Sequence, residues 1–283
     1  MIRFDEFVGE PMEFWHRARF ISEALGYTTS ERVSRDRRVM YYSPDNIIAL
    51  FHSRGYAIDG AEAEKQAHYS FLRAAAADEA RDNLMTAQEA REAYLNTASV
   101  AFGVGFSWRD LGINAPMNKQ TGEKKDVSFL TALVDLLTYS AIRGTDYVAD
   151  YDPHALIKVS DQYGRLQGVS SRRFDGAISS VENPLIVWEI KEYYYTTTFG
   201  SRISDGVYET RLDGFELSSF EQLVGYRPLH VLFTDSYSVW WEQGKSYLCR
   251  LIDMLNEGSV DRIYFGREVF DWETDLKDIL RLR

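Results

Sequence analysis

The sequence predicts an α/β fold in which helices flank a mixed central sheet, preceded by a mainly helical N-terminal region. Residues 1–115 show helical periodicity and helix caps but few strand signals. Beyond residue 127, short β-rich segments alternate with apolar helical ones. Apolar residues make up 45% of the 283-residue chain, which is enough to fill a sizeable core.

The N-terminal region, residues 1–115, should contain helices with recognisable starts. Ser43 is suited to cap a helix whose first position is Pro44. Thr86, with Glu89 three residues later, forms a capping-box pattern. We therefore expect helices at Pro11–Leu25, Pro44–Arg54, Ala61–Arg81 and Thr86–Leu95.

A second domain, residues 127–283, should follow a linker or exposed loop at 116–126, where the chain is polar and contains Pro and Gly. A meander of three strands, followed by a helical crossover into a further strand, predicts a mixed sheet with helices on its faces. The expected elements are the helix Val127–Arg143, the strands Ala155–Val159, Arg172–Ser179 and Leu185–Tyr194, the helix Leu217–Tyr226, the strand Leu229–Thr234, the helix Ser238–Leu255 and the strand Val260–Phe265, with a turn at Asp161–Gly168.

A long segment, Tyr193–Glu216, is expected to be irregular between the third meander strand and the next helix. Long loops in compact domains tend to be functional. Our hypothesis is that this segment clamps DNA or contacts a second subunit. The alternative is an excursion over the surface without such a role.

Composition excludes several classes of site. Cys249 is the only cysteine, so the chain can form neither an intramolecular disulfide nor a zinc site built from several thiolates. It lies in an apolar stretch and should be a buried core thiol. The N-terminus lacks an apolar signal core and no apolar run approaches a membrane span, so we expect a cytoplasmic protein without membrane contact.

The formal net charge of −11 argues against strong, indiscriminate binding of nucleic acid, which depends on Lys and Arg neutralising phosphates. Basic residues nevertheless gather in a few segments, which are either solvated surface or phosphate contacts. The residues that we expect to contact DNA are Arg35, Arg37 and Arg38 in the N-terminal region, Arg172 and Arg173 in the second meander strand, and Arg202 in the long segment. DNA recognition is accordingly assigned to the N-terminal region.

One group of residues combines the types that phosphodiester hydrolysis needs. Asp175 lies on the second meander strand, while Glu189 and Lys191 lie two apart on the third and so share a face. A short turn joins these strands, and a hairpin can bring Asp175 alongside Glu189. Carboxylates can bind Mg²⁺, which acidifies a bound water and neutralises phosphate oxygens, and the lysine can position or deprotonate that water or stabilise the growing charge.

The acid-x-Lys pattern by itself is weak, because Glu123–Lys125 and Asp275–Lys277 also match it. Neither of these has an apolar strand leading into it or a strand-borne Asp before it. Only Glu189-Ile190-Lys191 has both. The alternative for this group is an ordinary ion pair on the surface at the end of a strand.

These residues resemble the PD-(D/E)XK nuclease superfamily, which includes many type II restriction endonucleases. The resemblance rests on Phe174-Asp175, the gap of thirteen residues, and Glu189-Ile190-Lys191 at the end of an apolar strand. The Pro that names the motif is absent, since Arg173 and Phe174 precede Asp175. The resemblance covers roughly the second half of the chain and implies a restriction endonuclease-like core.

The resemblance also implies roles for individual residues. Asp175 and Glu189 would be ligands of Mg²⁺, for which Mn²⁺ may substitute, with the Ile190 carbonyl as a further ligand and Lys191 as the catalytic lysine. The family often adds an acid from the first helix, a place that Asp135 matches, although it could instead face solvent. Gln222 and Tyr226 resemble the Gln-x-x-x-Tyr element of the RecB-like branch, or are polar residues on a surface helix.

The expected function is that of a Mg²⁺-dependent endonuclease acting on double-stranded DNA, as a restriction or phage-defence enzyme. Cutting both strands with one site per chain calls for a homodimer. One alternative is a repair or recombination nuclease acting on ends, branched DNA or single strands. A second is a non-catalytic DNA-binding protein that keeps the fold, and a third is an unrelated α/β protein.

Overall fold

The computed structural model describes residues 1–118, 126–194 and 200–281, apart from the side chains of Ser201 and Arg202. Within these residues the central feature is a five-stranded sheet with the strand order β1-β4-β5-β6-β7. The first three strands of this order pair antiparallel and the last three pair parallel, which confirms the expected mixed sheet. The strands are β1 (Ala149–Tyr151), β4 (Gly176–Ile178), β5 (Ile186–Lys191), β6 (Leu229–Thr234) and β7 (Arg262–Phe265).

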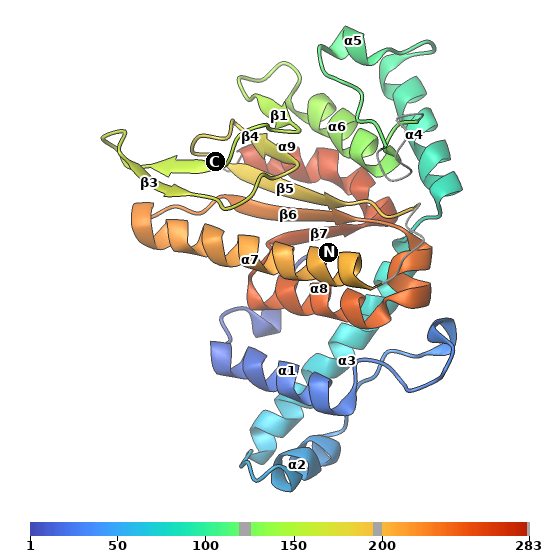
Figure 1. Ribbon diagram of the computed structural model, residues 1–283, viewed down its shortest axis with the longest axis vertical. Helices are drawn as coiled ribbons and strands as arrows, with labels where there is room; N and C mark the ends of the chain where they lie inside the picture. The colour runs from blue at the N-terminus through green and yellow to red at the C-terminus, as the bar shows by residue number, and fades with distance from the viewer. Residues whose placement is uncertain (119–125, 195–199, 282–283) are drawn as a thin grey trace.

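Helices cover both faces of this sheet (Figure 1). The helices α7 (Ser201–Val224) and α8 (Lys245–Glu257) lie on one face, and α6 (Phe129–Ile142) and α9 (Trp272–Arg281) lie on the other. The side chains of β5 alternate between these layers, so Trp188 packs in the cluster that contains α6 and α9. Its neighbour Val187 packs with the apolar residues of α7.

The N-terminal region is helical, as the sequence predicts. The Ser43 hydroxyl accepts a hydrogen bond from Asn46 N–H, and Thr86 and Glu89 form a capping box, so both expected helix starts are confirmed. A short helix, which the sequence does not reveal, follows α4. The elements are α1 (Met12–Leu25), α2 (Pro44–Ser53), α3 (Gly60–Asn83), α4 (Ala87–Phe102) and α5 (Trp108–Leu111).

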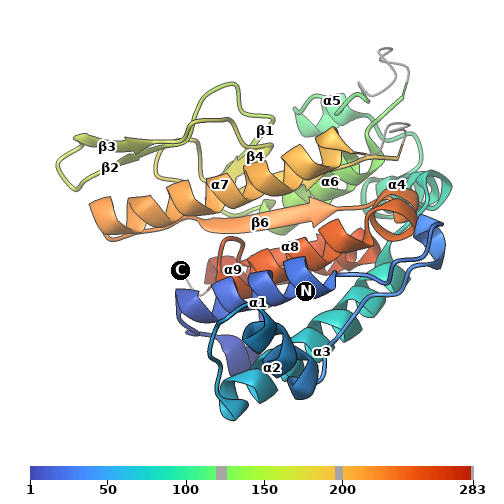
Figure 2. The ribbon, with the colours of Figure 1, turned by 60° about the horizontal axis from the view of Figure 1, so that its bottom comes forward.

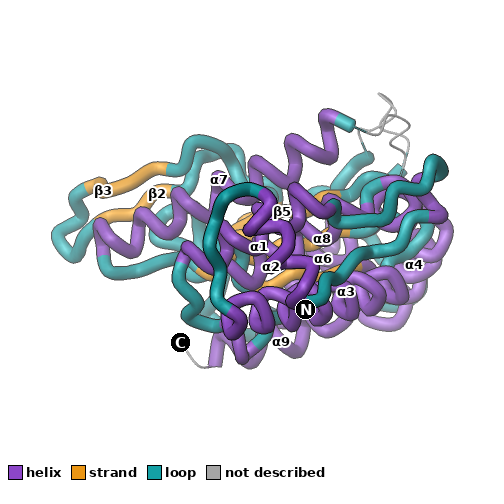
Figure 3. The backbone as a smooth tube through the Cα atoms, turned by 90° about the horizontal axis from the view of Figure 1, so that it is seen from below, coloured by secondary structure: helices purple, strands orange, loops and turns teal. Residues whose placement is uncertain are grey.

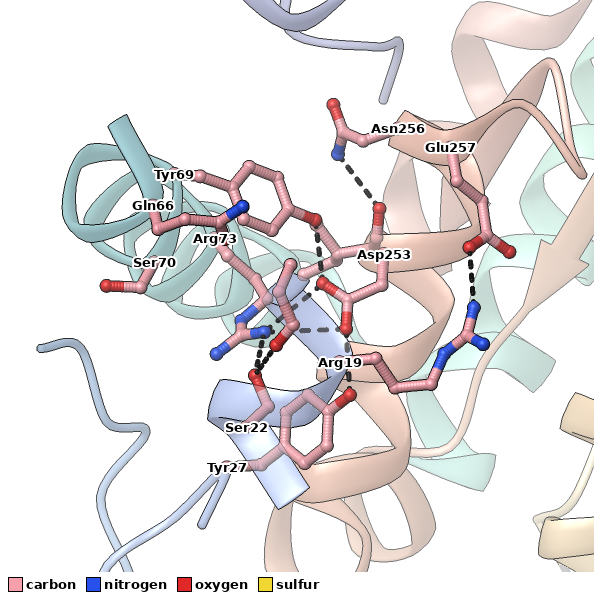
Figure 4. Close-up of polar contacts among 12 residues, drawn as sticks. Arg19, Ser22, Tyr27, Gln66, Tyr69, Ser70, Arg73, Asp253, Asn256 and Glu257 are labelled. Atoms are coloured by element: carbon pink, nitrogen blue, oxygen red, sulfur yellow. Dashed lines mark hydrogen bonds and ion pairs between the residues drawn. The ribbon is translucent and has the colours of Figure 1, made fainter. Parts of the chain in front are cut away.

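A buried polar network attaches the N-terminal helices to α8 (Figure 4). Asp253 accepts hydrogen bonds from Tyr27 Oη at 2.9 Å and from Tyr69 Oη at 2.6 Å. Arg73 Nη1 lies 3.3 Å from Asp253 Oδ1 and donates to Ser22 Oγ at 2.8 Å. Figure 2 shows α1 and α3 beyond α8, on the side away from β6. The N-terminal region is therefore packed against the helices of the sheet by charged groups as well as apolar ones.

The first strand of the expected meander is placed differently. Ala155–Val159 is not a strand of the central sheet; β1 at Ala149–Tyr151 takes that position. Part of the expected turn becomes a strand, because β2 (Lys158–Ser160) and β3 (Leu166–Val169) pair in a separate hairpin at one end of the molecule (Figure 3). The apolar Ile157 and Val159 misled the prediction, since they pack against α7 rather than in the sheet.

The long segment expected to be irregular is mostly helix, because α7 begins at Ser201; residues 195–199 lie outside the described part. The expected helix Leu217–Tyr226 is only the last part of α7. Two glycines weaken the helical signal of α7 in the sequence, but they allow the helix to pack closely against Tyr193 and Ser259. A Cβ on Gly214 would lie 2.3 Å from the Ser259 carbonyl oxygen, and one on Gly206 would lie 2.6 Å from Tyr193 Oη.

The expected helix Ser238–Leu255 is interrupted. A π-helical turn at Ser238–Gln243 ends at Gly244, and α8 begins at Lys245. Cys249 on α8 is fully buried, as expected. None of the described helices is long and apolar enough to cross a membrane.

Candidate functional site

A cleft of about 820 Å³ opens at the carboxyl end of β5. The end of β5 forms its floor, where Glu189, Ile190 and Lys191 follow an apolar run. Further lining residues come from α6, β1, the first half of α7, residues 114–118, and the loops that contain Asp152, His154, Arg172 and Asp175. The walls are predominantly polar, and the acidic side chains among them are Asp135, Asp150, Asp152, Asp175, Glu189, Glu192, Asp205 and Glu209.

The structure brings Asp175, Glu189 and Lys191 together in this cleft. Gly176 pairs with Trp188 across the two strands, and this register places Asp175 beside Glu189. Asp175 Oδ2 accepts a hydrogen bond from Ile190 N–H at 2.7 Å. Lys191 Nζ lies 2.8 Å from Glu189 Oε2, and the two residues are only 7% and 1% exposed. The acid-x-Lys pair is therefore buried and is not a surface ion pair.

The electrostatics of the three groups differ. The Asp175 side chain is exposed to the cleft, but the walls of the cleft partly desolvate its carboxyl group. This desolvation, together with the Glu189 charge, raises the pKa of Asp175 to about 7. Burial lowers the pKa of Lys191, but Glu189, Tyr193 and Asp175 together outweigh burial, so the pKa is raised. Lys191 therefore stays charged and is suited to stabilise negative charge rather than to remove a proton.

Asp135, the acid expected from the first helix of the second domain, faces the cleft and not bulk solvent. It lies on α6 and is buried. Burial raises its pKa well above the usual range, and the nearby charge of Asp175 adds to the shift. Its carboxyl group therefore holds a proton more strongly than an ordinary aspartate does, whereas the pKa of Asp175 is about 7.

Two acids of α7, Glu209 and Asp213, reach the site through Arg172, and the sequence did not reveal them. Arg172, which is also expected to contact DNA, donates from Nη1 to Asp213 Oδ2 at 2.7 Å. The same nitrogen lies 3.1 Å from Glu189 Oε2, and Arg172 Nη2 lies 3.6 Å from Glu209 Oε2. Desolvation and the Glu189 charge raise the pKa of Asp213 to about 7. Asp213 and the buried Leu217 are spaced as residues on one face of a helix. This signal could be used only if the first half of α7 had been recognised as a helix.

Glu192, which directly follows Lys191, has a different role. Its Oε1 accepts from Phe129 N–H at 2.9 Å, and its Oε2 accepts from Thr131 N–H at 3.1 Å. The carboxylate therefore caps the N-terminus of α6. This contact ties the end of β5 to α6, so it helps to hold the cleft in shape.

The donor set fits a hard divalent cation. Asp175 and Glu189 offer carboxylate oxygens, and the Ile190 carbonyl belongs to the same stretch of β5. Glu189 Oε1 is buried and lacks a hydrogen-bond partner within the described residues. Across the described ranges, however, no three His, Cys, Asp or Glu side chains cluster closely enough to hold an ion by themselves. A bound cation would therefore need the backbone carbonyl or water as further ligands.

Two family models match the chain. The model described as Domain of unknown function (DUF7687) matches residues 75–280, which is more than half of the sequence. The chain belongs to the DUF7687 family. The model described as Domain of unknown function (DUF7690) matches residues 1–86. No curated protein and no solved structure matches the chain.

The cleft residues named above all lie within the DUF7687 match, whereas part of the expected DNA-binding set does not. The N-terminal arginines Arg35, Arg37 and Arg38 lie between α1 and α2, next to the π-helical turn, and do not line the cleft. Arg173 is exposed, with Nη1 3.3 Å from His154 Nδ1. The Arg202 side chain lies outside the described part of the structure.

The Gln-x-x-x-Tyr resemblance finds no support in the geometry. Gln222 is exposed near the end of α7. Tyr226 lies beyond the helix and packs against the apolar cluster between α7 and the sheet. Neither residue lines the cleft.

Proposed function

We propose that this member of the DUF7687 family is a Mg²⁺-dependent nuclease that hydrolyses phosphodiester bonds of double-stranded DNA, with Mn²⁺ able to replace Mg²⁺. The observation that carries the proposal is the convergence of Asp175, Glu189 and Lys191 at the end of a buried strand in a cleft of about 820 Å³. A role in restriction or phage defence, and a homodimer that cuts both strands, belong to the same proposal.

The order of elements supports a restriction endonuclease-like core. A helix, α6, precedes the antiparallel strands β1, β4 and β5. Another helix, α7, then leads to β6, which pairs parallel with β5. This is the arrangement that the PD-(D/E)XK resemblance implies, with the β2–β3 hairpin inserted before β4.

The residues of the cleft have complementary parts in the proposed reaction. Asp175, Glu189 and the Ile190 carbonyl would hold the ion, which when bound acidifies a water molecule and neutralises phosphate oxygens. Asp175 must lose its proton to serve as an anionic ligand, and its pKa of about 7 places that loss near neutral pH. Lys191 remains charged and stabilises the negative charge that grows on the phosphate.

The charge of the cleft makes DNA binding depend on the cation. Eight carboxyl-bearing residues line it, against Arg172, Lys191 and His154. A phosphate backbone entering such a cleft meets unfavourable charge unless a divalent ion compensates for it. Tight DNA binding should consequently appear only when Mg²⁺ or Mn²⁺ is present.

A cleavage assay with two lysine variants tests the proposal. Unmodified and modified plasmid and phage DNA are incubated with Mg²⁺ or Mn²⁺ and wild type, Lys191→Ala or Lys277→Ala. Lys277 is a matched control because it belongs to another acid-x-Lys sequence, pairs with Glu273 on α9 and lies outside the cleft. We expect Lys191→Ala to lose at least about 100-fold in rate and Lys277→Ala to cleave like wild type.

The cleavage products distinguish between the alternative nuclease functions. Discrete bands support restriction, while gradual shortening from ends or preference for branched DNA supports a repair or recombination nuclease. Equal loss in both lysine variants would contradict the assigned role of Lys191. No cleavage and no binding of divalent ions by the wild type would refute the nuclease proposal and favour a non-catalytic protein.

A further inference from the structure

Asp213 is an unusual residue for the face of α7 that packs on the sheet. It is 0% exposed, and its neighbours on that face include the buried Ile203, Val207 and Leu217. Burying a carboxylate is costly unless a cation and hydrogen bonds compensate for it. Asp213 Oδ1 has no hydrogen-bond partner among the residues described, so the compensation comes through Oδ2.

The partner of Asp213 Oδ2 is Arg172, and this arginine also holds Glu189. Arg172 Nη1 donates to Asp213 at 2.7 Å and lies 3.1 Å from Glu189 Oε2. One guanidinium nitrogen carries two hydrogens and can serve both carboxylates at once. Because Lys191 Nζ lies 2.8 Å from the same Oε2, both cations gather on one oxygen of Glu189. The other oxygen, Oε1, keeps no partner within the described chain.

The packing of α7 fixes Asp213 in this position. The Gly214 backbone is pressed against the Ser259 carbonyl, where an added Cβ would approach to 2.3 Å. About two turns earlier, Gly206 lets the helix approach Tyr193, whose Oη would lie 2.6 Å from an added Cβ, and the Lys191 stem lies in ordinary contact at 3.7 Å. A rigid helix on both sides of Asp213 leaves its carboxylate little freedom to follow Arg172.

We infer that Asp213 is a positioning residue of the site: it anchors Arg172 and, through Arg172, sets the orientation of the Glu189 carboxylate. This inference rests on the proposed nuclease function. The contact with Asp213 at 2.7 Å keeps the guanidinium shared between two carboxylates. Without the Asp213 charge, Arg172 would pair mainly with Glu189, with Glu209 as a more distant partner at 3.6 Å. It would then compete with a metal ion for Glu189.

The substitution Asp213→Asn tests this, since it removes the charge while preserving the shape. Glu221→Gln is the matched control, because Glu221 is an exposed acid on the same helix outside the cleft. Affinity for Mn²⁺ is measured by titration calorimetry on the full chain without DNA. The kcat and KM for DNA cleavage and the midpoint of urea unfolding are measured on the same preparations.

We expect Asp213→Asn to raise the Kd for Mn²⁺ about tenfold and to lower kcat between about 10-fold and 100-fold, with KM for DNA within about twofold of wild type. Arg172→Lys should behave alike, because a single ammonium cannot bridge both carboxylates in the same geometry. This second variant, at a side chain that is 29% exposed, also serves if Asp213→Asn does not fold. The double variant should be little worse than either single one, because the two residues act as a unit.

Wild-type Mn²⁺ affinity and kcat in folded Asp213→Asn would overturn the inference and leave the nuclease proposal standing. Additive losses in the double variant, or a fall in activity no larger than the fall in folded protein, would also overturn it. A wild type that neither binds Mn²⁺ nor cleaves DNA would instead refute the proposed function, and the inference with it.

Discussion

The contact between Gly176 and Trp188 gives a quantitative test of how the sheet supports the site. An alanine Cβ at position 176 would lie 1.9 Å from Trp188 Cε2 and Cζ2, whereas carbon atoms pack at about 3.5–4.0 Å. Trp188 is fully buried in the cluster under α6, so its ring would have to move by roughly 2 Å into close-packed neighbours. Overpacking of this kind lowers the free energy of unfolding by about 1–3 kcal/mol. Because the ring is fully buried, we expect Gly176→Ala to cost about 3 kcal/mol, at the upper end of this range.

Urea unfolding of Gly176→Ala and of Gly60→Ala measures this cost. A Cβ on Gly60, in the first turn of α3, would meet nothing within 4 Å, so that variant should match wild type or gain up to about 1 kcal/mol. A loss of about 3 kcal/mol corresponds to a fall of about 1 M in the urea midpoint. Gly176→Ala should also impair cleavage, because Asp175 directly precedes it. Stability within about 0.5 kcal/mol of wild type would refute the packing argument.

Two further predictions concern stability away from the cleft. Burial lowers the pKa of His230 to about 4 from its ordinary value near 6.5, so His230 contributes stability that is present above pH 6.5 and is lost as pH falls towards 4. The loss is about 3 kcal/mol, at about 1.36 kcal/mol per pKa unit. The difference in unfolding free energy between wild type and His230→Asn should therefore shrink as pH falls over this range. A difference that stays constant with pH would contradict this prediction. Asp253→Asn should lower the unfolding free energy by about 3 kcal/mol, because it leaves the buried Arg73 guanidinium uncompensated. The exposed Asp78→Asn should change it by less than about 0.5 kcal/mol, and equal effects of both substitutions in urea unfolding would argue against a role for burial.

The parts of the fold that could be predicted from sequence are those with a strong local signal. Helix starts at Ser43 and Thr86 were predictable because a capping side chain and its partner lie within one turn of chain. The strand Leu229–Thr234 was predicted with its observed bounds, since a short, mostly apolar run is typical of a central parallel strand. The same reasoning located Glu189 and Lys191 at the polar end of β5.

The errors occurred where the signal depends on distant residues. Nothing in Ala149–Tyr151 indicates a strand, because this edge strand is held by backbone pairing with β4 and has no fully buried side chain. The first half of α7 looks irregular because it contains glycines. Those glycines are required by the close approach of Ser259, which is remote from α7 in sequence, and of Tyr193, which follows β5.

The sequence by itself determined the mixed sheet, most of the helices and three residues of the candidate site. Spacing along a strand and the chemistry of Asp, Glu and Lys are local properties, so they can be read from the chain. Only the tertiary structure decided that Arg172 pairs with Glu189 and Asp213, and that Asp135 turns into the cleft. These contacts join a loop, a strand and two helices, and the free energy of burying charge depends on what surrounds it after folding.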